Sequence, residues 1–150
     1  MINIKSALAF ALIGISLVFT GACQSSSATI WDPTGIWNVS FVLTIELSDS
    51  TDIDSWTEPL TLSGSTRSGT VSGFTWDATF SPQDGTYTVS GDHGITIRFD
   101  FRVGSIDRII TLTGSTSESN LNFMGGSGTW EVGGNTHSVT FTATKATNLQ

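Results

Sequence analysis

The sequence predicts an all-β domain folded as an antiparallel up-and-down barrel of eight or nine strands. Charged residues make up only 13% of the chain, about half the usual share. Short segments of alternating apolar and polar residues recur about every ten residues, separated by glycine-rich turns. A β-sandwich is the alternative, and the barrel is favoured because closure removes exposed sheet edges.

The first strand is predicted over residues 37–47, where apolar and polar residues alternate as in a half-buried strand. Residues 48–55 are predicted to form an acidic loop, and residues 56–63 a second strand. The apolar positions of the first strand are Trp37, Val39, Phe41, Leu43, Ile45 and Leu47.

The third strand is predicted over residues 69–80, with Phe74, Trp76, Ala78 and Phe80 on one face. Gly69 and Gly73 indicate bending or a β-bulge near its start. A turn at residues 82–85 then leads to a short strand over residues 86–90.

The clearest strand pattern covers residues 95–103, with an apolar face and a face of alternating charge. Residues 106–113 are its expected hairpin partner, and further strands are predicted at residues 120–124, 128–132 and 137–144. A cross-strand charge ladder is expected on the outer barrel face. Its members are Arg98, Asp100, Arg102, Asp107 and Arg108.

Residues 1–22 have the three zones of a secretory signal peptide. Lys5 gives a positive start, residues 7–19 are almost wholly apolar, and small residues follow at positions 20–22. The apolar run is shorter than the roughly 20 residues of a transmembrane helix.

Thr20-Gly21-Ala22-Cys23 resembles the bacterial lipobox, with Thr20 in place of the preferred leucine. The resemblance implies cleavage before Cys23, a diacylglyceryl group on its thiol, and a lipid-anchored protein of the cell envelope. Gln24, which is not aspartate, implies outer-membrane sorting if the cell is Gram-negative. The alternative is an ordinary signal peptide with a chance cysteine; Cys23 is the only cysteine, so no disulfide within the chain accounts for it.

The expected organisation is a cleaved leader at residues 1–22, a lipidated cysteine with a flexible tether at residues 23–34, and a barrel at residues 35–150. Loss of Lys5 with the leader leaves five basic and thirteen acidic residues, a net charge of −8. Nucleic acid is therefore not an expected partner. An anionic membrane surface would also repel the domain, so something other than charge must hold it there.

Gly35-Ile36-Trp37 follows an Asp-Pro-Thr turn and resembles the Gly-x-Trp start of calycin barrels, which include lipocalins and avidins. The resemblance implies that Trp37 closes one barrel end beneath a basic residue of the last strand. Gly35, Trp37 and Lys145 are the residues expected to form this closure. Biotin binding is not carried over, because the avidin tryptophan and asparagine pattern does not align.

Aromatic side chains are the main functional lead, because small barrels can enclose one small ligand. They favour a lipocalin-like module that binds a small hydrophobic molecule. The alternative is a solid core in a structural or interaction lipoprotein of the envelope, whose protein partner the sequence does not identify. The pocket candidates are Trp37, Phe41, Trp76, Phe80, Phe99 and Phe101.

No catalytic residue, metal ligand or cofactor motif is predicted, so the chain is not expected to be an enzyme. His93 lies in a predicted turn and His137 begins the last predicted strand, and neither has metal-ligand spacing. Four acidic residues could offer oxygen ligands to calcium, but a solvated loop is the favoured interpretation because their spacing is not that of an EF-hand. They are Asp49, Asp52, Asp54 and Glu58.

Overall fold

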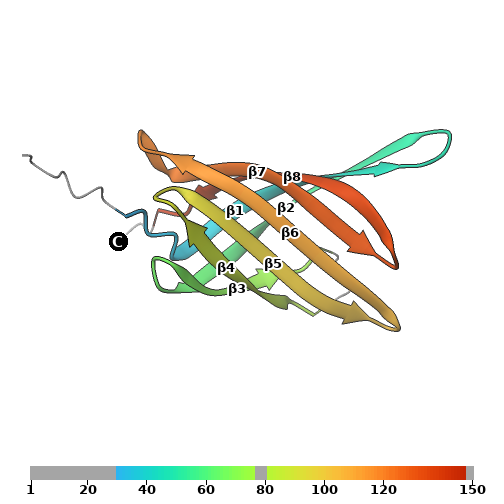
Figure 1. The fold of residues 1–150 in the computed structure, drawn as a ribbon, viewed down its shortest axis with the longest axis horizontal. Coiled ribbons are helices and arrows are strands. Elements are labelled where there is room, and N and C mark those ends of the chain that lie inside the picture. Colours follow the sequence, from blue (N-terminus) through green and yellow to red (C-terminus); the bar gives the residue numbers. More distant parts are fainter. Residues whose placement is uncertain (1–29, 77–80, 148–150) are drawn as a thin grey trace, which may run out of the picture.

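A computed structural model describes residues 30–76 and 81–147 as one closed antiparallel barrel (Figure 1). Each strand pairs with the next along the chain, and β8 pairs with β1 to close the ring. The barrel prediction is confirmed, and the sandwich alternative is excluded. The strands are β1 (Gly35–Glu46), β2 (Thr51–Gly64), β3 (Ser68–Phe74), β4 (Gln83–Ser90), β5 (Gly94–Val103), β6 (Ile106–Ser117), β7 (Asn120–Val132) and β8 (Asn135–Lys145).

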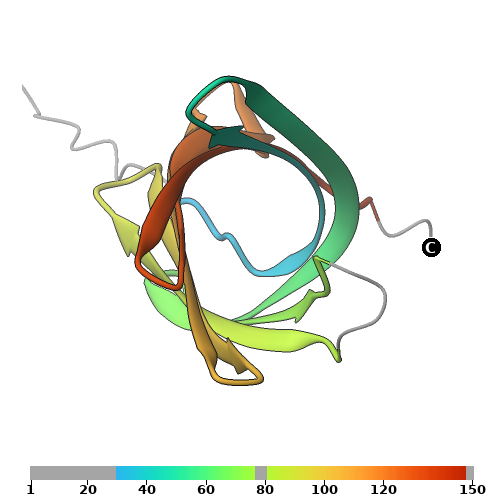
Figure 2. The same ribbon diagram turned by 90° about the vertical axis from the view of Figure 1, so that its right-hand side faces the viewer.

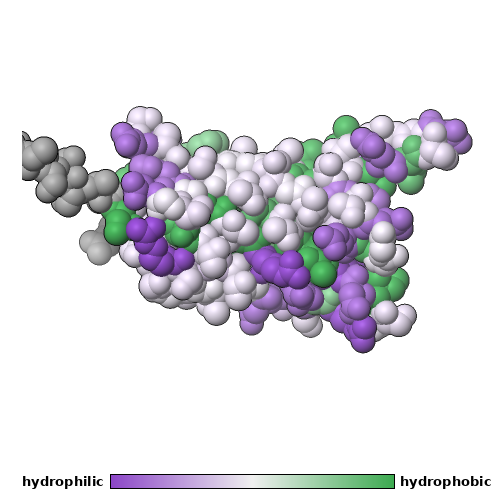
Figure 3. All heavy atoms as spheres, viewed as in Figure 1, coloured by the Kyte–Doolittle hydropathy of each residue, from purple (hydrophilic) through white to green (hydrophobic). Residues whose placement is uncertain are grey.

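Alternation along each strand separates the bore from the outer face. In β1, the buried side chains of Val39, Phe41 and Leu43 alternate with exposed Ser40 and Val42. Pale and purple residues, neutral or hydrophilic, cover most of the face seen in Figure 3, with apolar residues showing between them. The periodicity predicted for the first strand therefore corresponds to an apolar interior and a mainly polar exterior.

The predicted loop at residues 48–55 is wrong in its extent. The turn is confined to four residues, in which the Leu47 amide donates to the Ser50 carbonyl at 2.8 Å, and β2 begins at Thr51. Acidic side chains did not end the pairing, because both faces of the hairpin are exposed over residues 51–55 while the backbone continues its ladder with β1. Since β8 pairs with β1 only as far as Thr44, the β1–β2 hairpin extends beyond the barrel (Figure 1).

The third strand is shorter than predicted, because β3 ends at Phe74. Gly73 has φ +98°, and the register with β4 shifts between Val71 and Phe74, so the irregularity that the glycines indicate is present. The chain then leaves the sheet at Thr75. Ala78 and Phe80 lie outside the described residues.

Residues 120–124 and 128–132 belong to one strand, β7, so the barrel has eight strands and not nine. Glycines interrupt the sequence pattern here because β6 and β7 approach very closely. A Cβ atom at Gly126 would overlap the carbonyl oxygen of Thr113, and one at Gly128 would overlap that of Thr111. Glycine therefore permits the strand to continue where it was expected to end.

The charge ladder is present only in part. On the outer face, Arg98 pairs with Asp100 at 3.2 Å and Arg102 pairs with Asp107 at 2.6 Å. Arg108 does not join them, because it has the same parity as buried Ile110 and therefore faces the bore. Its assignment to the outer ladder is wrong.

Candidate ligand-binding site

One end of the barrel is closed by residues that precede the first strand. Trp31 is only 1% exposed, and its indole N–H donates to the Leu121 carbonyl at 3.0 Å. The Trp37 indole donates to the Pro33 carbonyl at 2.8 Å, and the two indole rings meet edge to face at 6.0 Å. In Figure 2 this segment crosses the far end of the barrel. Residues 31–34, assigned to the tether, thus pack against the domain because two tryptophans anchor them.

The three residues expected at the closure lie together at this closed end. Lys145 Nζ donates to the Asp32 carbonyl at 3.1 Å and lies 5.7 Å from the centre of the Trp37 ring. Gly35 has φ +123°, and a Cβ atom there would lie 3.0 Å from the Lys145 side chain. A glycine at position 35 therefore lets the lysine lie flat across the end of the barrel.

The middle of the bore is filled by aromatic rings. Three pocket candidates, Trp37, Phe41 and Phe99, are fully buried among other core side chains. Phe74 packs edge to face on Phe41 and stacks on Phe99, with ring centres 5.9 and 4.5 Å apart. These candidates therefore fill the barrel and do not line an open space.

At the opposite end, the mouth, a cavity of about 180 Å³ remains between side chains of several strands. Of the pocket candidates, Trp76 lines it, whereas Phe101 lines a minor cleft beside Phe74 and Trp76. Phe80 lies outside the described residues. The residues that line this mouth cavity are Leu43, Ile45, Trp76, Arg108, Trp130, Val132 and His137.

Strand register brings the polar members of the mouth cavity together. Arg108 of β6 lies opposite Val132 of β7, and Trp130 of β7 lies opposite His137 of β8. These residues share the inward face of three neighbouring strands. His137, expected to play a strand-end or surface role, is half-buried and lines the mouth cavity.

A buried carboxylate holds the chain just before Trp76. Glu58 is 5% exposed, and its Oε2 accepts hydrogen bonds from the Thr75 amide at 2.7 Å and the Thr75 hydroxyl at 2.8 Å. Its Oε1 accepts from the Trp56 indole at 3.3 Å. Glu58 was grouped with the solvated acidic residues, although its parity matches that of buried Leu60. Its hydrogen bonds to Thr75 thus help to place the next residue, Trp76, at the mouth.

Two hydrogen-bond donors at the mouth have no acceptor among the described residues. Both Arg108 Nε and Trp130 Nε1 are buried and unpaired. The Arg108 guanidinium lies 4.8 Å from the centre of the Trp76 ring, and Trp76 meets Trp130 edge to face at 4.1 Å. Since a buried donor without an acceptor is costly, this site favours an acceptor from outside the chain.

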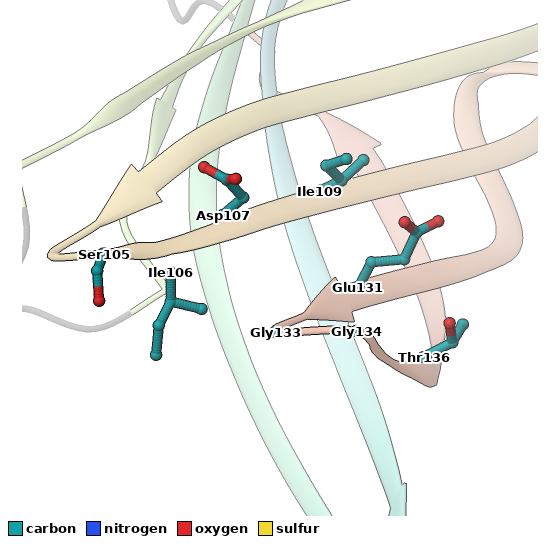
Figure 4. Close-up of a pocket in the computed structure, with 8 residues that line it drawn as sticks. All are labelled: Ser105, Ile106, Asp107, Ile109, Glu131, Gly133, Gly134 and Thr136. Carbon is teal, nitrogen blue, oxygen red and sulfur yellow. The ribbon is translucent and has the colours of Figure 1, made fainter.

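A second hollow, of about 380 Å³, lies on the outside of the barrel between two hairpin turns (Figure 4). Its Ile109 and Glu131 are the outward neighbours of buried Ile110 and Trp130. The Asp107 carboxylate beside it is already paired with Arg102. This groove is separate from the bore and presents no unpaired buried donor, so the mouth cavity is the better candidate.

Within residues 30–76 and 81–147, no group of three or more histidine, cysteine or acidic side chains could hold a metal ion. No helix in that part of the chain is long and apolar enough to cross a membrane. Cys23, the expected lipidation site, lies outside it.

Fold and site together define a class: a closed eight-stranded up-and-down β-barrel, sealed at one end and hollowed at the other. Among solved structures, a redesigned β-barrel is similar, with a TM-score of 0.51 and 9% sequence identity. The match covers 80% of this chain and 95% of the redesigned one, and at this identity it shows the fold alone. No protein-family profile matches the chain. No curated protein matches it either.

Proposed function

We propose that this chain is a lipid-anchored envelope protein whose lipocalin-like barrel binds a small apolar molecule at its mouth. The observation that carries the binding proposal is the contrast between the two ends of the bore. Tryptophans seal one end, whereas the other keeps a cavity lined largely by apolar side chains. Apolar concavities with a few polar groups are the usual form of small-molecule sites.

The cavity limits the size of the ligand. At about 30 Å³ per water molecule, 180 Å³ corresponds to roughly six waters, less than a drug-sized pocket. The cavity therefore suits a small molecule, or one end of a longer molecule that extends into solvent. The filled aromatic core leaves the mouth as the place of entry.

Filling the cavity tests the binding proposal. Val132→Trp should place an indole in the mouth and abolish the quenching of tryptophan fluorescence by small lipophilic ligands. Val42→Trp, on the outer face of β1, is the matched control and should bind as wild type does. Equal binding by both variants, or no binding by the wild-type protein, would reject a ligand site at the mouth.

The anchor rests on the lipobox resemblance and on chain length. Trp31 docks at the closed end, so only residues 24–30 separate Cys23 from the barrel. The eight steps from Cys23 to Trp31 span at most about 29 Å at ~3.6 Å each. A diacylated cysteine would hold the domain stably, because two acyl chains suffice for lasting membrane attachment.

Cys23→Ser tests the anchor directly. The variant should move from the membrane fraction to the soluble fraction, and mass spectrometry should show lipid on the wild-type amino terminus only. Gln24→Ser is a neighbouring control that keeps the cysteine and should remain membrane-bound. Retention of Cys23→Ser in the membrane fraction at the wild-type level would reject the lipid anchor.

A second candidate, an interaction role in the envelope, is favoured by the projecting β1–β2 hairpin. Its Leu47 and Ile53 are 58% and 65% exposed. Apolar side chains on a projecting element are a common form of protein contact. Photo-crosslinking from position 53 in cells should then recover a defined partner, and recovery of no specific partner would count against this role.

A further inference from the structure

Arg108 differs from the two arginines that lie nearest to it in sequence. Arg98 and Arg102 each contact a carboxylate on the outer face. Arg108 forms no ion pair among the described residues. Its guanidinium lies over the Trp76 ring, and its Nε is buried without a hydrogen-bond partner. Arginine stays protonated at physiological pH, so the mouth cavity has a positive charge that no carboxylate of residues 30–76 or 81–147 pairs with.

Trp130 contributes a second donor from the adjacent strand. Its indole is 1% exposed, and its Nε1 is buried and unpaired. Because Arg108 lies opposite Val132 and Trp130 lies two residues before it, the two side chains are diagonal neighbours on the inward face. At such positions long side chains can reach a common group.

The other charges in the described part of the chain do not oppose an anion at this point. Among those residues Glu58 is the buried carboxylate, it already accepts three hydrogen bonds, and it does not line the mouth cavity. The carboxylates of Asp107 and Glu131 belong to the outer groove. The mouth cavity thus combines an apolar wall from Leu43, Ile45 and Val132 with donors that only an acceptor can satisfy.

We propose that the mouth cavity binds a small monocarboxylic acid, with its carboxylate on Arg108 Nε and Trp130 Nε1 and its apolar body against the β1 and β7 side chains. This inference rests on the proposed function, because it specifies the ligand of the same site. A carboxylate suits a planar guanidinium, which can donate two parallel hydrogen bonds. The chain is acidic overall, so selectivity for an anion must come from these local donors and not from the net charge.

The test compares hexanoate with hexanamide, a neutral molecule of similar size, by calorimetry on the full chain in phospholipid nanodiscs. Empty nanodiscs provide the background. Hexanoate should bind about tenfold to a hundredfold more tightly than hexanamide, as expected for a hydrogen bond to a charged group. The Trp130 indole N–H resonance, assigned by its loss in Trp130→Phe, should shift with hexanoate.

Arg108→Met should weaken hexanoate binding about tenfold to a hundredfold and so remove the preference for hexanoate over hexanamide. Arg98→Met is the matched control, because it removes the same charge from the outer face. Trp130→Phe keeps a ring at the site and should weaken hexanoate binding more than hexanamide binding. Thermal melting checks that each variant is folded.

The possible failures are distinguishable. Equal binding of both probes, or an unchanged preference in Arg108→Met, would overturn the carboxylate assignment and leave the proposed apolar site intact. Binding of neither probe by the wild-type protein would overturn the assignment, and absence of any ligand in the Val132→Trp comparison would overturn the proposed function as well.

Discussion

Glu58 of β2 fixes the position of Thr75, the residue directly before Trp76 at the mouth, through hydrogen bonds. Glu58→Gln should lower the free energy of unfolding by about 1–3 kcal/mol, because an amide cannot accept from both Thr75 donors and the Trp56 indole as a carboxylate does. Urea denaturation measures the loss. Glu131→Gln, on the outer face, should change stability by less than about 0.5 kcal/mol. Equal losses of stability from the two substitutions would show that the hydrogen bonds of Glu58 do not stabilise the fold.

Asp32 is the second residue with a defined electrostatic role. The backbone N–H of Thr34, 2.9 Å from Asp32 Oδ1, holds the pKa of this carboxyl below its ordinary value of 3.8. Because the pKa is lower in the folded state, Asp32 stabilises the fold above pH ~4, and this contribution disappears as the pH falls through the folded pKa. Carbon-detected NMR titration should show the lowered pKa, and Asp32→Asn should reduce the loss of stability in acid. A titration at or above 3.8 would contradict this reasoning.

At the scale of elements, the glycines of β7 provide a matched pair. Gly126→Ala should destabilise the barrel by about 1–3 kcal/mol or more, because its new methyl group would overlap the β6 backbone. Gly125→Ala should be tolerated, since the nearest atom to its Cβ position is 3.4 Å away. Thermal denaturation of the two variants checks the difference. Similar melting temperatures would show that β6 and β7 can separate at little cost.

The alternation of apolar and polar residues predicted the strands in which one face is apolar and the other is polar, as in β1 and β5. It failed at β7, because glycines that usually end strands are required there by close backbone approach. Arg108 shows the same limit at the site: its charge indicated the outer face, while its parity with Ile110 indicated the bore. The odd or even position of a residue in a strand indicates which face it lies on, but its distance along the barrel axis depends on strand register. The sequence therefore could not show that Arg108, Trp130 and His137 meet at the mouth.

At the scale of the whole molecule, the short link from Cys23 to Trp31 implies an orientation on the membrane. The closed end should face the lipid. The mouth should lie roughly 28 Å farther away, given the steps of ~3.3 Å from the first to the last of the 12 residues of β6 and a strand tilt of ~40°. Spin labels at Glu118 and Ser105, in the turns at the two ends of β6, test this. Relaxation by a nickel-chelating lipid should be stronger at Glu118, and the reverse order would contradict the orientation.

The pairing of β8 with β1 also determines when the fold can be completed. All other neighbours are consecutive in the chain, so hairpins can form as each strand emerges, whereas Trp37 must wait for Lys145 more than a hundred residues later. During that interval the growing sheet is an open ribbon whose first strand can pair with another copy of the chain. A chain that stops before Asn135 would never leave this state. With Cys23→Ser in both chains to remove the anchor, light scattering should show that the shortened chain self-associates while the full-length chain remains monodisperse.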